Sequence, residues 1–219
     1  MQPKAHDVLK KVYGFDTYRG QQEQIIDHVI SGGNAFVLMP TGSGKSLCYQ
    51  IPSICREGVG VVVSPLVALM QDQIQALTLL GVKCAAINSN MSAEANAASI
   101  RKMRAGELDM VYVAPERLLS DEFLGILKQT KLALFAIDEA HCVSQWGHDF
   151  RPHYTDLYKL AELFPDIPRI ALTATADAPT RKDILERLHL KNGRTFISDA
   201  IVPIYIIPYF LKVMLSNKF

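Results

Sequence analysis

Residues 39–46 constrain the fold of this chain more than any other stretch, because they read Met-Pro-Thr-Gly-Ser-Gly-Lys-Ser and directly follow the apolar run of residues 35–38. Gly42 and Gly44 let the backbone fold around an anion with successive N–H groups pointing inward. A helix expected to begin near Lys45 adds the positive end of its dipole. This succession of strand, glycine-rich loop and helix predicts a phosphate-binding loop.

Within this loop, Lys45 would place its charge on the outer phosphates of a nucleoside triphosphate such as ATP, and the Ser46 hydroxyl would ligate the accompanying Mg²⁺. The common form of the motif begins with glycine, whereas this one begins with Met39. A surface turn that happens to end in Lys-Ser is the alternative, and the flanking strand and helix argue against it. The predicted nucleotide-binding residues of the loop are Thr41, Gly42, Ser43, Gly44, Lys45 and Ser46.

Apolar strands and amphipathic helices alternate along the whole chain, which predicts an α/β fold: a doubly wound, mostly parallel sheet of about seven strands with helices on both faces. Ligands of such sheets bind at the carboxyl ends of the strands. Strands are predicted at residues 35–39, 59–63, 82–87, 110–113, 132–137, 169–173 and 195–198. Helices are predicted at residues 66–80, 93–105, 121–129, 154–163 and 179–188.

Chain length, net charge and cysteine count limit the possible class of protein only broadly. A chain of 219 residues is long enough for one large domain, and a formal net charge of +1 does not exclude a local nucleic-acid-binding patch. The four cysteines form no C-x-x-C pair and three of them lie in or beside apolar segments, which is typical of reduced thiols in a cytosolic protein. No secretory signal is visible, and we expect a cytoplasmic protein of a bacterial cytosol or nucleoid.

Two adjacent carboxylates, Asp138 and Glu139, follow the apolar strand of residues 132–137. Like charges at the rim of a buried sheet repel each other unless a cation lies between them. The sequence therefore predicts that Asp138 holds Mg²⁺ and that Glu139 orients and deprotonates the water that attacks the γ-phosphate. The alternative is an acidic turn at the end of a strand.

Upstream of the phosphate loop, Arg19 and Gln22 are candidates for holding the base of the nucleotide. A planar amide can donate to and accept from the edge of adenine, and an aromatic or guanidinium group can stack on its face. An ordinary helix start with a polar face would give the same residues.

Four residues are candidates for binding nucleic acid: Ser64, Trp146, Phe150 and Arg151. Ser64 follows the strand of residues 59–63, where hydroxyl and N–H groups commonly contact a phosphate backbone, although it could equally cap a helix. The polar segment of residues 142–152 holds the only tryptophan of the chain. Trp146 and Phe150 in a loop beside the acidic pair suggest aromatic faces on which bases stack.

This loop also has two alternative interpretations. His141, Cys142, His148, Asp149 and His153 could form a metal site, although their spacing matches no familiar zinc pattern. Trp146 could also be an ordinary core tryptophan. Beyond the loop, Thr173 and Thr175 close a later strand, where their hydroxyls could reach the acidic pair and, together with His141, couple the nucleotide to the nucleic-acid face.

With these residues assembled, the chain resembles the first motor lobe of a superfamily 2 helicase, and more closely that of a RecQ-type DNA helicase, a RecA-like P-loop lobe with a DEAH motif. The resemblance spans residues 7–199 and includes the adenine motif, the phosphate loop, the Asp138-Glu-Ala-His motif, the aromatic-rich loop and Thr173-Ala-Thr. It implies ATP-dependent translocation in the 3′ to 5′ direction on single-stranded or partly duplex DNA, in recombination and repair. Oligomeric state is not indicated.

Residues 200–219 depart from the family pattern, which would continue into a second lobe, a zinc-binding domain and a winged helix. The segment is shorter than the run of about 20 residues that spans a membrane and is interrupted by Pro203 and Pro208, so no membrane span is predicted. We expect a truncated product with residues 1–199 as the ATP-binding lobe. Such a chain would bind ATP with weak or no hydrolysis, and would not unwind DNA alone.

Two other functions remain open at this point. One is a nucleotide- and DNA-binding module without motor activity, including a decayed product, and the other is the lobe of an RNA helicase. Comparing how strongly DNA and RNA oligonucleotides stimulate ATP hydrolysis would separate an RNA helicase lobe from a DNA helicase lobe.

Overall fold

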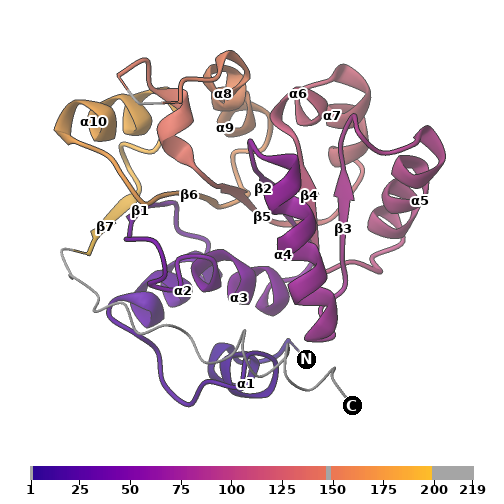
Figure 1. The fold of residues 1–219 in the computed structure, drawn as a ribbon, viewed down its shortest axis with the longest axis horizontal. Helices are drawn as coiled ribbons and strands as arrows, with labels where there is room; N and C mark the ends of the chain where they lie inside the picture. The colour runs from indigo at the N-terminus through magenta and orange to yellow at the C-terminus, as the bar shows by residue number, and fades with distance from the viewer. Residues whose placement is uncertain (1, 147–148, 199–219) are drawn as a thin grey trace.

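A single parallel sheet organises the molecule (Figure 1). The computed structural model describes residues 2–146 and 149–198. The seven strands pair in the order β3-β4-β2-β5-β6-β1-β7, and every described pairing is parallel. Their bounds are β1 Ala35–Leu38, β2 Val59–Val63, β3 Cys84–Ile87, β4 Met110–Val113, β5 Leu132–Ile137, β6 Arg169–Thr173 and β7 Arg194–Ile197. This confirms the predicted doubly wound α/β fold.

The central strands are apolar on both faces because both faces are covered. Every residue of β2, β4 and β5 except Tyr112 is apolar, and all of them are buried. A parallel strand needs a crossover connection to its neighbour, and the helices that make these crossovers cover the sheet. The continuous apolar runs in the sequence therefore correspond to strands between two helical layers.

Two hydrophobic cores lie on the two sides of the sheet. One side is covered by α1 Ala5–Lys11, α2 Gln22–Ile30, α3 Leu47–Cys55 and α4 Val67–Leu79. The other side is covered by α5 Ala93–Arg104, α6 Pro115–Leu118, α7 Asp121–Leu127, α8 Pro152–Thr155, α9 Lys159–Leu163 and α10 Ala178–Arg187, with the 3₁₀ helices η1 Ala140–Val143 and η2 Asp156–Tyr158. Figure 1 shows α1, α2 and α3 below the sheet, α4 in front of its central strands, and α6 to α10 above it.

The predicted helix over residues 154–163 is wrong as a continuous element. The structure has α8, a 3₁₀ turn η2 and α9 over this stretch. Tyr154, Leu157 and Leu160 are all buried at a spacing of three, which matches the period of the 3₁₀ turn η2 between the two short α-helices. All three side chains therefore face the core although the helix is interrupted.

Other boundaries differ from the predicted ones by a few residues. Helix α3 begins at Leu47 rather than near Lys45, because a tight turn comes first: the N–H of Leu47 donates to Gly44 and that of Cys48 to Lys45. Strand β3 begins at Cys84, two residues later than predicted, since the N–H of Val82 still donates to Leu77 of the preceding helix. The predicted tail of residues 200–219 lies outside the described residues.

Because all strands run the same way, their carboxyl ends form one edge of the sheet. The loop after β1 and the acidic pair after β5 both lie there, separated only by β6. This edge is therefore where segments distant in sequence can form one site.

Candidate nucleotide-binding site

The loop after β1 has the conformation that its glycines require. Gly42 and Gly44 have φ angles of 80° and 81°, which residues with a Cβ adopt only at a cost. A Cβ on Gly44 would lie 2.4 Å from Nε2 of Gln22, so this position also lacks room for a side chain. The Ser43 hydroxyl donates to the Pro40 carbonyl at 2.6 Å and closes the turn. Backbone shape and side-chain packing both specify glycine at position 44.

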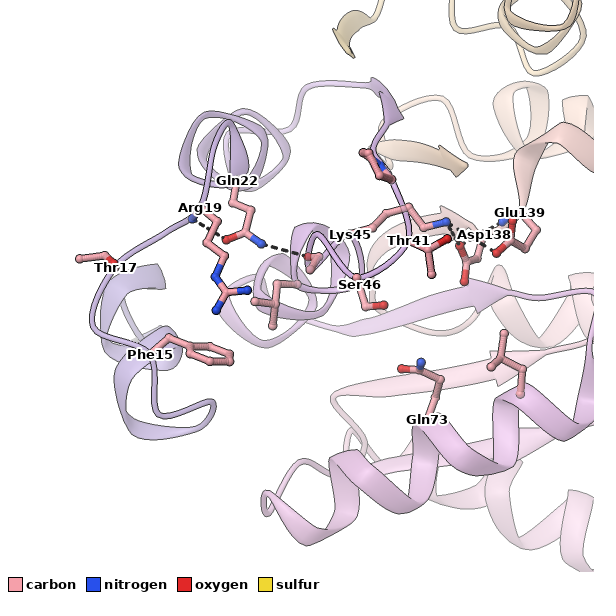
Figure 2. Close-up of a pocket in the computed structure, with 15 residues that line it drawn as sticks. Phe15, Thr17, Arg19, Gln22, Thr41, Lys45, Ser46, Gln73, Asp138 and Glu139 are labelled. Atoms are coloured by element: carbon pink, nitrogen blue, oxygen red, sulfur yellow. Dashed lines mark hydrogen bonds and ion pairs between the residues drawn. The ribbon is translucent and has the colours of Figure 1, made fainter. Parts of the chain in front are cut away.

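Lys45 joins this loop to the acidic pair (Figure 2). Its Nζ lies 3.6 Å from Oδ1 of Asp138 and 3.6 Å from Oε1 of Glu139. The side chains of Lys45 and Asp138 are each 13% exposed, so this ion cluster is only partly screened by water. Burial raises the pKa of Asp138 above its usual value; Lys45 opposes this shift and the neighbouring Glu139 charge adds to it.

The Glu139 carboxylate reaches the cluster from an unusual backbone conformation. Glu139 has φ 49° and ψ 46°, in the left-handed region that is disfavoured for a residue with a Cβ. Its N–H donates to Oδ1 of Asp138 at 3.0 Å, and its carbonyl accepts from the N–H of Cys142 at 2.9 Å. Non-glycine residues held in this region are frequently found at functional sites.

His141 connects Glu139 to the end of β6. Its Nδ1 lies 3.3 Å from Oε2 of Glu139 and 3.0 Å from Oγ1 of Thr173. The Thr173 hydroxyl also lies 3.0 Å from the Thr175 carbonyl, and when it donates there, it accepts a hydrogen bond from Nδ1 of His141. The structure thus brings together His141, Thr173 and the backbone of Thr175, the three predicted coupling residues, whose function stays a prediction.

Gln22 bridges the phosphate loop and the segment before α2. It is 2% exposed, its Nε2 donates to the carbonyls of Ser43 at 3.1 Å and Gly44 at 3.2 Å, and its Oε1 accepts from the N–H of Arg19 at 2.9 Å. Arg19 in turn lies over the Phe15 ring, 5.7 Å from its centroid. The predicted base-binding segment therefore lies beside the loop, with its amide hydrogen-bonded within the protein.

One cavity of about 380 Å³ unites these groups. It is lined by the loop, the acidic pair and the segment of Phe15, Thr17, Arg19 and Gln22 (Figure 2). Leu69 and Gln73 on α4 also line it, and sequence reasoning missed both as site residues. They are four residues apart, hence on one face of α4, and Oε1 of Gln73 accepts from Gln50 on α3 at 3.3 Å. Their helical spacing was visible in the sequence, but the direction of that face was not.

The four candidates for nucleic-acid contact differ in accessibility. Trp146 is 75% exposed, so its interpretation as a core tryptophan is wrong. Phe150 is 37% exposed, and Nη1 of Arg151 donates to the Pro65 carbonyl at 2.8 Å, which ties the loop to the segment after β2. Ser64 is buried, with 3% of its surface exposed, so its predicted phosphate contact would come from a neighbouring backbone group or require a rearrangement.

The alternative metal site in this loop finds no support among the residues that the structure describes. Cys142 Sγ lies 3.9 Å from Nε2 of His141 and 3.8 Å from Oδ2 of Asp149. Among the described residues, however, no three His, Cys, Asp or Glu side chains come together in a way that could hold a metal ion. His148 lies outside these ranges. Likewise, no helix within residues 2–146 and 149–198 has the length and apolar character needed to cross a bilayer.

The arrangement matches a known family. The model of the DEAD/DEAH box helicase family matches residues 19–184, which include the loop, the acidic pair and the ends of β5 and β6. The chain belongs to this family.

Among its relatives, the ATP-dependent DNA helicase RecQ of Haemophilus influenzae is 46% identical over 195 residues, covering 89% of this chain and 32% of that protein. The RecQ of Bacillus subtilis is 42% identical over 194 residues, with coverages of 88% and 33%. The chain thus spans about a third of the length of these curated relatives. The similarity confirms the resemblance to the first lobe of RecQ-type helicases.

Solved structures support the fold of this helicase lobe. A hypothetical ATP-dependent RNA helicase from Sulfolobus tokodaii superposes with a TM-score of 0.63 at 22% identity, covering 86% of this chain and 57% of that one. At this identity the similarity concerns the fold alone. The seven-stranded sheet therefore has the same fold as the matching part of that structure.

DEAD/DEAH box helicases use ATP with a divalent metal ion, and the residues present fit both groups. The positive-φ glycines leave a concave backbone for phosphates, and Lys45 points into the same cavity. Ser46 and Asp138 offer hard oxygen ligands there, and a site with so few protein ligands suits a metal that keeps phosphate oxygens and waters in its shell.

Proposed function

We propose that this chain is the ATP- and DNA-binding first lobe of an ATP-dependent DNA helicase of RecQ type that moves 3′ to 5′ in recombination and repair. The observation that carries the proposal is the meeting of Lys45, from the loop after β1, with Asp138 and Glu139, from the end of β5, in one cavity that also contains the Phe15–Gln22 segment. The RecQ names of its relatives support DNA as the nucleic acid.

In the proposed mechanism each group has one role. Lys45 binds the outer phosphates, and Ser46 and Asp138 hold Mg²⁺. Arg19 holds the adenine together with the Gln22 amide, which must first release the carbonyls of Ser43 and Gly44. Glu139 accepts a proton from the attacking water, and the His141 ring, whose Nδ1 lies 3.3 Å from Oε2 of Glu139, lies beside this carboxylate. When bound, the metal ion neutralises charge that develops on the phosphates.

For nucleic acid, we propose that Trp146 and Phe150 stack on bases of single-stranded DNA and that Arg151 and the segment at Ser64 lie near its backbone. Trp146 has the exposure that stacking requires. We place the protein in the cytoplasm, at the bacterial nucleoid, where its DNA substrate would be. Preference for single-stranded or partly duplex DNA belongs to this proposal.

Residues 1–199 are proposed as the functional lobe, and hydrolysis by the 219-residue chain alone is expected to be weak. In related phosphoryl-transfer enzymes an arginine supplied across the site contributes on the order of 10³–10⁵ in turnover. The curated relatives are about three times longer than this chain and have room for such a group elsewhere. Nucleotide binding, by contrast, needs only the cavity described here.

The test combines binding and turnover on the purified chain. We expect Mg²⁺-dependent ATP binding, lost in Lys45→Ala, and slow hydrolysis that single-stranded DNA stimulates more than RNA of the same length. Glu139→Gln should keep ATP binding and abolish the residual hydrolysis. Failure to bind ATP would refute the proposal. Binding without any DNA-stimulated turnover would favour a non-motor nucleotide-binding module, and stronger stimulation by RNA would favour an RNA helicase lobe.

A further inference from the structure

Tyr154 makes a contact that the proposed mechanism does not use. It lies in α8, is completely buried, and donates its hydroxyl to the backbone carbonyl of Asp138 at 3.0 Å. That carbonyl belongs to the peptide group joining Asp138 to Glu139. A side chain from a separate helix thus contacts the main chain between the two acidic residues.

The orientation of this peptide group decides where the Glu139 carboxylate points. Glu139 is in the left-handed region, and its N–H, at the other side of the same peptide group, donates to Oδ1 of Asp138. A rotation of the peptide would break that bond and turn Glu139 away from Lys45, and relief of the disfavoured backbone conformation would promote such a rotation. The Tyr154 hydroxyl opposes it by holding the carbonyl.

The other end of the same helical turn is fixed to the predicted nucleic-acid face. Arg151 precedes α8, and its carbonyl accepts from the N–H of Tyr154 at 2.9 Å. Its side chain donates to Pro65 after β2, and its N–H donates to Cys142 at 2.9 Å. A displacement of the Trp146 loop would therefore move α8, and the Tyr154 hydroxyl with it.

The phenol is a permanent donor in this position. Burial raises the pKa of Tyr154 well above its usual value, and the nearby Cys142, Asp138 and Glu139 raise it further, while Arg151 opposes them. Tyr154 thus keeps its proton throughout the physiological pH range. Tyr158, one turn later, offers a contrast: it is partly exposed and packs against the His189 ring, and its hydroxyl makes no hydrogen bond among the described residues.

We propose that Tyr154 is a positioning residue whose hydroxyl holds the Asp138–Glu139 peptide in the orientation that aims Glu139 into the nucleotide cavity. Through Tyr154, this orientation depends on the position of the loop that carries Trp146. The proposal rests on the proposed function, because it requires both ligands to bind. It assigns Tyr154 no contact with nucleotide or DNA.

The test is the coupling between the two ligands in Tyr154→Phe. A fluorescent, non-hydrolysable ATP analogue is titrated with Mg²⁺ into the chain, with and without a saturating oligothymidine of about 20 nucleotides. Allosteric coupling typically changes an affinity by roughly 5–150-fold, and we expect a change in this range in the unmodified chain. Tyr154→Phe should reduce it to less than about twofold and leave the affinity for each ligand alone within about threefold.

Two controls make the result specific. Tyr158→Phe removes a hydroxyl from the same segment and should keep the original coupling. Phenylalanine retains every ring contact of Tyr154, so the variant should fold, which its circular dichroism and thermal unfolding verify. Coupling that persists in Tyr154→Phe, or that is absent from an unmodified chain binding both ligands, would overturn the inference. Failure of the unmodified chain to bind either ligand would instead refute the proposed function.

Discussion

Lys45 Nζ lies 3.6 Å from Oδ1 of Asp138, across the cavity between the loop after β1 and the end of β5. Asp138 and Glu139 share this one ammonium group, since Nζ also lies 3.6 Å from Oε1 of Glu139. The lysine therefore neutralises the acidic pair, and in the proposed function it would also contact the outer phosphates, with Ser46 and Asp138 as the residues that would hold Mg²⁺.

Lys45→Ala is expected to lower ATP affinity by at least about tenfold, because a charge-assisted hydrogen bond contributes about 1.5–3 kcal/mol. Isothermal titration with ATP and Mg²⁺ measures the effect. Lys191→Ala provides the control, since it removes an exposed lysine that pairs with Glu186 at 3.1 Å on the surface. An unchanged ATP affinity in Lys45→Ala would contradict the assigned site.

Gly44→Ala is expected to destabilise the protein more than a positive φ angle alone explains. The left-handed conformation costs a residue with a Cβ about 1–2 kcal/mol, and the clash with Gln22 adds to it. Gly81→Ala is the matched control, because Gly81 has φ 80° and a Cβ added there would meet nothing within 4 Å. Urea unfolding of both variants compares the free energies, and equal losses would show that the Gln22 contact is unimportant.

Trp146→Ala should weaken single-stranded DNA binding and leave stability unchanged. Stacking of one base on an aromatic side chain contributes about 1–3 kcal/mol, which corresponds to roughly 5–150-fold in affinity. Leu79→Ala is the control. Leu79 is 74% exposed, against 75% for Trp146, and it lies at the C-terminal end of α4, away from the carboxyl ends of the strands. Fluorescence anisotropy with labelled oligonucleotides should show a loss for Trp146→Ala alone; equal affinities would remove Trp146 from the proposed interface.

The buried thiols predict a loss of stability in mild alkali. Burial raises the pKa of Cys48 to about 12, of Cys55 to about 11 and of Cys142 to about 12. Above about pH 9 an unfolded chain releases these protons while the folded protein keeps them, so stability is fully present below pH 9 and falls as the pH rises toward the folded pKa values.

Each such thiol contributes up to about 1.4 kcal/mol per pH unit to this slope. Urea unfolding at several pH values from about 8 to 9.5 measures it, a range that stays below the usual tyrosine pKa of about 10. In Cys48→Ala the slope should be shallower by about that amount, whatever the variant's stability at neutral pH. Parallel slopes for both proteins would mean that Cys48 titrates normally in the folded state.

Much of the fold followed from the sequence because its signals are local. The runs at residues 59–63 and 132–137 are apolar over the length of a strand, and both strands were predicted with the bounds that the structure has. Ser92 and Ser120 cap helices α5 and α7 through hydrogen bonds to residues three positions later. Around residues 154–163, by contrast, the buried spacing of three competed with the helical pattern, and the predicted helix was wrong.

The site divides in the same way. The sequence identified the phosphate-binding loop and the acidic pair because the functional groups of each lie on consecutive residues, 39–46 and 138–139. Leu69, Gln73 and Tyr154 have no such signal, because their contacts are made with residues far away in the chain. The exposure of Trp146 also could not be read from its neighbours, since a core residue would have the same flanking sequence.

By itself, the sequence determined that this chain forms a parallel α/β lobe with a phosphate-binding loop and an acidic strand end, because backbone conformation and hydrophobic pattern are properties of short segments. Only the tertiary structure decided that Lys45 bridges the acidic pair, that Gln22, which was expected to hold the base, is hydrogen-bonded to the phosphate loop, and that the Tyr154 hydroxyl contacts the carbonyl before Glu139. The physical reason is the order of the strands: packing β6 between β1 and β5 brings residues almost a hundred positions apart to one edge of the sheet, a distance over which no local pattern carries information.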